Sequence, residues 1–134
     1  MATQKTISEI DLINNCYYYF IETLAVLIKS PEEQCRIMKN YNVAYELKTD
    51  ALSVDCLLNQ NIIEFTEEQK KFMLDLSKRL HDLPEQVLIG SDKEAENLNS
   101  MNNPCWNDIK EASINLLALL KAVTEQNHRY FQVK

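Results

Sequence analysis

The sequence predicts an all-α protein, a single-domain bundle of four long helices with one or two short ones across residues 1–134. The first observation is that Gly90 is the one glycine in 134 residues. Tight turns and phosphate-binding loops use glycine, because they need positive φ or a close backbone approach. The second observation is a set of clear helix starts, and the third is apolar residues at three- and four-residue steps. The composition therefore counts against Rossmann and P-loop chemistry.

The first helix is predicted from about residue 7 to 29. Thr6 and Glu9 match the capping-box pattern, in which the threonine side chain accepts a hydrogen bond from a backbone amide and the glutamate side chain accepts one from the threonine amide. Apolar residues then recur at alternating three- and four-residue steps, which places them on one helical face. That face consists of Ile10, Ile13, Tyr17, Phe20, Leu24 and Ile28.

The next helix start is indicated by Ser30-Pro31-Glu32-Glu33. The serine can cap the helix N-terminus, the proline fits the first turn, and the two carboxylates interact favourably with the positive end of the helix dipole. A short helix follows to about Asn40. Another apolar stripe then forms from Ala44, Leu47, Ala51, Val54 and Leu58. The spacing leaves open whether these two helices join through residues 40–42 or bend there.

Residues 59–65 are predicted as a loop, after which Thr66 and Gln69 form a second capping box. The helix that follows has the apolar face Phe72, Leu76, Leu80 and Leu83, and Pro84 ends it. Residues 85–103 are the least regular part, with a short helical turn at 91–96. The last helix starts at Asn103-Pro104, and the tail from about residue 127 is expected to fray. Its inward residues are Trp106, Ile109, Ala112, Leu116, Leu120 and Val123.

The charge balance limits the partners. The chain has 14 basic and 20 acidic residues, which gives a net charge of −6. Such a surface repels phosphate, so direct binding to nucleic acids or to anionic membranes is disfavoured and a basic protein partner is favoured.

No export signal is visible, and polar residues interrupt the apolar stretch 12–28, so a cytoplasmic location is expected. The four cysteines, predicted to be reduced and separate in the core, are Cys16, Cys35, Cys56 and Cys105.

No catalytic or metal-binding pattern stands out. His81 and His128 are far apart, and neither has a second ligand or an orienting partner nearby, since adjacent helical residues such as His81 and Asp82 do not face each other. Both are predicted to be solvated surface histidines. We expect no cofactor, no metal and no enzymatic activity. An enzyme would need carboxylates in a pocket between helices.

Acidic residues without a local cation are the candidate binding residues. Glu46 and Asp50 stand four apart on one flank of a helix, and such a like-charge pair costs about 0.2–0.5 kcal/mol. A second acidic segment faces only Lys93 and contains Glu85, Asp92, Glu94 and Glu96. Two interpretations stay open: these carboxylates bind a cationic group of a partner molecule, or a lysine of an adjacent helix neutralises them.

Two segments carry a family resemblance: Asn40-Tyr-Asn-Val-Ala-Tyr-Glu-Leu-Lys-Thr-Asp50 and Met101-Asn-Asn-Pro-Cys-Trp106. With the order of helices, they resemble small bacterial immunity proteins of polymorphic toxins, notably those of contact-dependent growth inhibition systems. The resemblance implies a cytosolic protein that binds a toxin domain, often a nuclease with a basic cleft, and blocks its active site. Glu46 and Asp50 lie inside a resembling segment and are the first candidates for the interface, with Tyr45 beside them as an aromatic anchor.

The alternative hypothesis is a helical scaffold or adaptor that self-associates or bridges other proteins. Tyr18 and Tyr19 would carry that role, because exposed tyrosines bring contact area with little loss of entropy. The simpler reading is that they cover the flank of a neighbouring helix. The oligomeric state is left open by the sequence.

Overall fold

The computed structural model describes residues 7–39, 41–88 and 90–133. Within these residues every regular element is helical, which confirms the all-α class. The expected capping box at Thr6 lies outside the described residues. The α-helices are α1 (Ile7–Leu27), α2 (Pro31–Ile37), α3 (Val43–Ala51), α4 (Ser53–Leu58), α5 (Glu67–His81), α6 (Glu94–Met101), α7 (Asn107–Leu119) and α8 (Lys121–Gln132). Two 3₁₀ helices, η1 (Glu85–Leu88) and η2 (Pro104–Trp106), connect them.

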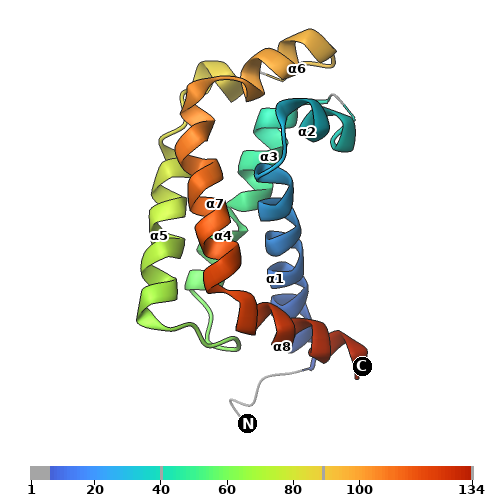
Figure 1. The fold of residues 1–134 in the computed structure, drawn as a ribbon. Helices are drawn as coiled ribbons and strands as arrows, with labels where there is room; N and C mark the ends of the chain where they lie inside the picture. The colour runs from blue at the N-terminus through green and yellow to red at the C-terminus, as the bar shows by residue number, and fades with distance from the viewer. Residues whose placement is uncertain (1–6, 40, 89, 134) are drawn as a thin grey trace.

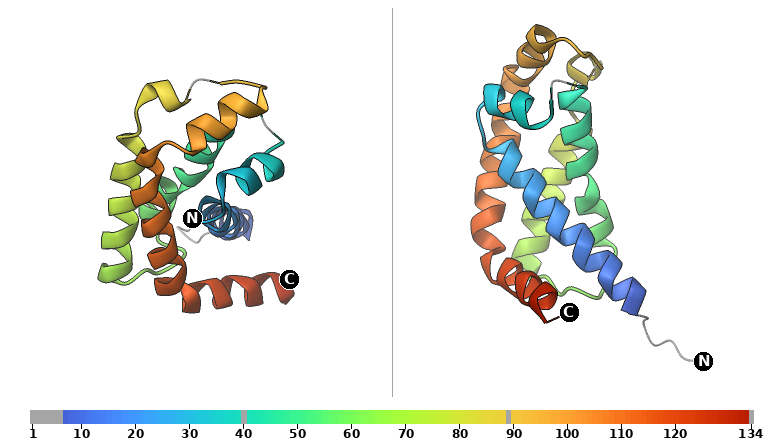
Figure 2. Two further views of the ribbon diagram at one scale, coloured as in Figure 1. Left: turned by 45° about the horizontal axis from the view of Figure 1, so that its top comes forward. Right: turned by 90° about the vertical axis from the view of Figure 1, so that its right-hand side faces the viewer.

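The long helices lie side by side and share one core. α1, α5, α7 and the consecutive pair α3–α4 form the body of the molecule, with α2 and α6 at one end and α8 at the other (Figure 1). α7 packs against both α5 and α1, and α1 also packs against α3, α4 and α8. Figure 2 shows α1 crossing the other long helices at an angle. Fully buried side chains from these elements include Tyr17, Phe20, Leu47, Leu57, Leu76 and Leu116.

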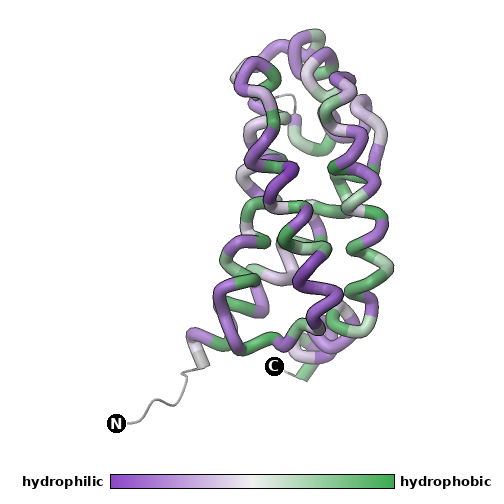
Figure 3. The backbone as a smooth tube through the Cα atoms, turned by 90° about the vertical axis from the view of Figure 1, so that its left-hand side faces the viewer, coloured by the Kyte–Doolittle hydropathy of each residue, from purple (hydrophilic) through white to green (hydrophobic). Residues whose placement is uncertain are grey.

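Helix starts follow local side-chain chemistry. The Ser30 hydroxyl accepts from the Glu33 amide at 3.1 Å, which caps α2 as expected. At α5 the capping box is complete, because the Thr66 amide donates to the Gln69 side chain at 2.8 Å and the Gln69 amide donates to the Thr66 hydroxyl at 3.1 Å. Hydrophobic and hydrophilic residues alternate along the helices, as amphipathic packing requires (Figure 3).

The single stripe expected over 44–58 is two helices, because the chain turns at Leu52. The open question about residues 40–42 is answered by the backbone on either side of Asn40, which is itself outside the described residues. Lys39 and Asn42 have φ of 62° and 49°. The left-handed conformation interrupts a helix, so α2 and α3 are separate.

Two further differences concern the second half of the chain. A full helix, α6, stands where a short helical turn at 91–96 was expected. The last predicted helix is η2, α7 and α8, with a break at Leu120. The segment expected to fray from residue 127 continues as α8 to Gln132. Asn127 is buried and donates to the Asn14 carbonyl oxygen at 2.9 Å, which fixes α8 across α1. The four-long-helix arrangement is therefore not confirmed in detail.

Candidate functional site

A groove of about 550 Å³ lies between α1 and α3. Its apolar part comes from Val26, Met38, Leu47 and Leu52, and its acidic part comes from Glu22 and Asp50. Tyr19 stands at the edge with 65% of its surface exposed. An apolar floor with carboxylates at the rim fits a long cationic side chain, whose alkyl stem packs while its charge stays at the surface.

The two first candidates, Glu46 and Asp50, are neighbours on α3, but of the two Asp50 alone lines this groove. The pKa of the Asp50 carboxyl is raised by burial and by the charge of Glu46. Both effects disfavour the ionised form. Tyr45 precedes Glu46 on α3 and is 52% exposed, so the third candidate is accessible beside them.

Among the described residues, no cation neutralises these carboxylates. Neither Glu22, Glu46 nor Asp50 takes part in any of the ion pairs of the described chain. The contrast with α5 is clear, since Arg79 lies 2.9 Å from Asp75 and 3.2 Å from Asp108. Within residues 7–39, 41–88 and 90–133, the carboxylates of the groove thus have no cationic partner.

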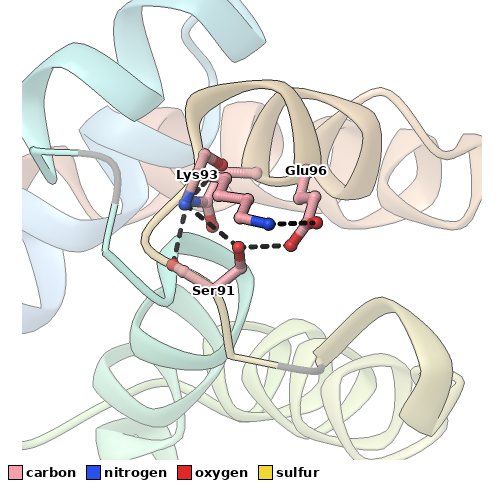
Figure 4. Close-up of polar contacts among 4 residues, drawn as sticks. Ser91, Lys93 and Glu96 are labelled. Atoms are coloured by element: carbon pink, nitrogen blue, oxygen red, sulfur yellow. Dashed lines mark hydrogen bonds and ion pairs between the residues drawn. The ribbon is translucent and has the colours of Figure 1, made fainter.

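The second acidic segment is distributed differently. Glu85 lies in η1, Asp92 precedes α6, and Glu94 and Glu96 lie in its first turn; all four are exposed and none lines the α1–α3 groove. Glu96 already has partners. Its carboxylate accepts from the Ser91 hydroxyl and lies 4.0 Å from the Lys93 ammonium (Figure 4). The partner of Glu96 is thus the local Lys93 at the start of the same helix, and not a lysine of an adjacent helix, so neither of the two interpretations is decided.

The only glycine of the sequence lies against the Asn42 side chain, next to the hydrogen bonds that join this segment to the start of α3. A Cβ atom placed on Gly90 would lie 2.2 Å from the Asn42 side-chain oxygen, so no larger residue fits without movement. The Asn42 amide donates to the Ser91 carbonyl oxygen at 2.9 Å, and the Val43 amide donates to the Asn97 side-chain oxygen at 3.1 Å. Close backbone approach, rather than positive φ, is the reason for glycine here.

A second, aromatic groove of about 440 Å³ lies between α1 and α8. The Tyr18 ring packs edge-to-face on Tyr19 at 5.3 Å and on Phe131 at 5.9 Å, and lies 6.4 Å from His128. Tyr18 therefore covers the flank of α8, as the simpler reading held. Tyr19 lines this groove as well as the acidic one, so the two surfaces meet at its ring. His128 is exposed, as expected, but it belongs to an ordered helix, with its ring beside Tyr18.

His81 is exposed, as predicted, but contrary to expectation it has a carboxylate partner. Its Nε2 lies 3.0 Å from Asp55, whose other carboxylate oxygen accepts from the Ser77 hydroxyl at 2.5 Å. The pKa of Asp55 is lowered: burial acts to raise it, but the hydrogen bonds from Ser77 and His81 and the charge of His81 outweigh burial. Although the residue types match a catalytic triad, the connections do not, because Ser77 is bonded to the aspartate rather than to the histidine. The cluster links α4 to α5.

The described part of the chain can be searched for a metal site and for a membrane-spanning helix. Its His, Cys, Asp and Glu side chains form no group of three or more that would hold a metal ion. None of the described helices combines the length and apolar character needed to cross a bilayer. The cysteines are not uniformly buried as predicted: Cys35 is buried, Cys16 and Cys105 are half-buried and Cys56 is exposed.

Sequence reasoning missed the α1 wall of the groove. Glu22 appeared only as a polar interruption of an apolar stretch, yet it lies three residues after Tyr19 and therefore on the same side of α1. That spacing was the available signal. Comparisons of the chain with protein-family models, with curated proteins and with solved structures find no match.

Proposed function

We propose that this protein is a non-enzymatic inhibitor that binds a cognate toxin domain in the cytoplasm and occludes its basic active-site cleft, as immunity proteins do. The observation that carries the proposal is the α1–α3 groove, which is lined by Glu22 and Asp50. Glu46 lies near enough to Asp50 to raise its pKa, and none of these three carboxylates has a counter-ion among the described residues. The family resemblance of residues 40–50 to immunity proteins points to the same α3 surface.

The electrostatics give this arrangement a physical purpose. Burial of Asp50 and, after it, the nearby charge of Glu46 disfavour the ionised carboxylate in the unbound protein, as the raised pKa of Asp50 indicates. A partner's lysine or arginine offsets this effect through its attraction for the carboxylate. The net charge of −6 adds long-range steering toward a basic cleft, which raises the association rate.

The surroundings of the carboxylates also suit a protein partner. Tyr19 lines the groove, Tyr45 directly precedes Glu46 on α3, and both are more than half exposed. Tyrosine, tryptophan and arginine are enriched in the energetic centres of interfaces. We therefore expect arginine residues of the toxin to enter the groove beside Tyr19, and Tyr45 to contact the toxin from the exposed surface of α3.

The test is protection of cells that express the toxin domain encoded by the gene immediately upstream. The variant Glu46→Lys/Asp50→Lys should no longer protect the cells from the toxin domain, although its circular dichroism spectrum should stay helical. The matched control is Glu64→Lys/Glu68→Lys, which makes the same charge change at two exposed glutamates with the same spacing. Equal protection by both variants, or an upstream gene that encodes no secreted protein with a variable C-terminal domain, would contradict the proposal.

The aromatic groove favours one second candidate, a scaffold that self-associates through α1 and α8. Tyr19 is 65% exposed there, beside the half-buried Phe131. Sedimentation of the purified protein separates the two functions. A tight homo-oligomer that Tyr19→Ser dissociates would favour the scaffold, whereas a monomer at micromolar concentration favours the inhibitor.

A further inference from the structure

Two thiols from different helices lie side by side in this fold. The Cys16 thiol, on α1, donates to the Ser53 carbonyl oxygen at 4.0 Å at the start of α4. Cys56 follows Ser53 by three residues, so both lie on the same side of α4, the side that meets α1. Cys56 is close enough to Cys16 to hydrogen-bond its thiol. Forty residues of chain separate the two cysteines, so no motif in the sequence indicates the pair.

The environments of the two thiols differ. Cys56 is exposed, whereas Cys16 is half-buried in the wall of the acidic groove. Burial, and then the neighbouring Cys56, raise the pKa of Cys16 to about 11. Cys56 is thus the thiol that a reagent in solution reaches first, because it is the more accessible of the two. Cys16 is placed to react second, from the protein side.

We infer that Cys16 and Cys56 form an oxidation site, at which a low-molecular-weight disulfide such as glutathione disulfide converts the two thiols to an intramolecular disulfide. In the first step the Cys56 thiolate attacks one glutathione sulfur, the glutathione S–S bond breaks, and one glutathione leaves as thiolate and takes up the proton. In the second step the Cys16 thiolate attacks the Cys56 sulfur of the mixed disulfide and releases the second glutathione. Two protein thiols are oxidised and one glutathione disulfide is reduced.

The bond would join α1 to α4 at the edge of the groove. Cys16 precedes Tyr19 by one helical turn, and both line the same groove. Oxidation therefore fixes the α1 wall relative to Ser53 and removes a polar S–H group from the lining. An effect of the bond on partner binding rests on the proposed function, whereas formation of the bond does not.

The experiment is incubation of the full-length protein with glutathione disulfide, followed by intact-mass measurement and non-reducing peptide mapping. The wild type should become lighter by two hydrogen atoms, with the peptides of Cys16 and Cys56 joined and dithiothreitol restoring both thiols. Cys16→Ser should stop at a product heavier by one glutathionyl group on Cys56. Cys56→Ser should give no intramolecular bond. Cys105→Ser, a half-buried cysteine outside the pair, should behave as the wild type.

The contrary results are equally specific. A wild type that retains a stable glutathionyl group on Cys56, or that joins any other pair of cysteines, would overturn the inference. The peptide map of the wild type decides this even where a serine variant fails to fold. Closing a loop of this length should also raise the melting temperature, by about 7–14 °C. If the disulfide forms but oxidised and reduced protein protect cells equally, only the coupling to the proposed function is wrong.

Discussion

Neutralising Asp50 should make the folded protein more stable at neutral pH. In the structure, burial and Glu46 raise the pKa of this carboxyl. A group whose pKa is higher in the folded than in the unfolded state favours folding below its unfolded pKa, and this contribution is lost as pH rises through the folded pKa. At pH 7 the ionised Asp50 therefore lowers the free energy of unfolding. The substitution Asp50→Asn removes the charge and keeps the shape.

The magnitude follows from the position of Asp50. A like-charge pair four residues apart on a helix costs about 0.2–0.5 kcal/mol. Asp50 also lies in the last turn of α3, where the helix dipole disfavours a negative charge. Because the side chain is exposed, solvent screens these interactions and we add nothing further for burial. For a chain of this length, a gain of that size raises the melting temperature by about 1–2 °C.

The assay is thermal unfolding followed by circular dichroism at pH 7 and at about pH 3, at low and high salt. The gain for Asp50→Asn should disappear at the acidic pH, where the wild-type carboxyl is protonated, and shrink at high salt. Asp75→Asn is the control, because Asp75 lies 2.9 Å from Arg79 and its neutralisation should lower the melting temperature. If Asp50→Asn is destabilising like the control, Asp50 is compensated in the folded protein and the reasoning fails.

Three further predictions concern the fold. Asp55→Asn should lower the free energy of unfolding by about 1 kcal/mol at pH 7, and urea unfolding should show the difference vanish as pH falls through the range of the lowered carboxyl pKa. Gly90→Ala should cost about 1–2 kcal/mol, because its Cβ would meet Asn42, and adding Asn42→Gly should restore most of that loss in a double-mutant cycle; an additive cycle would exclude the contact. Asn127→Ala should cost about 1–3 kcal/mol through its lost hydrogen bonds to Asn14, and an unchanged urea midpoint would show that α8 is not held there.

Local chemistry made several helix starts predictable. Ser30 and Thr66 cap their helices with side chains that lie within three residues of the amides they bind. α6 was expected only as a short helical turn, because its N-cap residue, Lys93, provides no side-chain cap that would indicate a full helix. Its stability comes from packing on α2 and α3, which no local pattern reveals.

The break at Leu120 had no sequence signal for a related reason. Leu116, Leu120 and Val123 are all buried, so the apolar stripe continues across the break without change. The chain turns there because α8 packs across α1, with Tyr17 bonded to Thr124 at 2.8 Å. Such a tertiary cause is not readable from spacing.

The candidate site divides in the same way. Glu46 and Asp50 were identifiable because a four-residue spacing on one helix fixes their proximity. Glu22 belongs to α1, and Cys16 meets Cys56 across two helices, so these neighbours depend on how the helices pack. Sequence reasoning could find the half of the groove that is local to α3, and only the fold could add the other half.

The most direct test of the central idea is the association rate constant between the purified protein and the upstream-encoded toxin domain, measured at two ionic strengths. If the acidic groove binds a basic cleft, the association rate constant should fall steeply as the salt concentration rises. It should also be lower for Glu46→Lys/Asp50→Lys than for the wild type, and unchanged for Glu64→Lys/Glu68→Lys. A rate constant that depends neither on salt nor on either charge reversal would show that the α1–α3 carboxylates do not contact the partner.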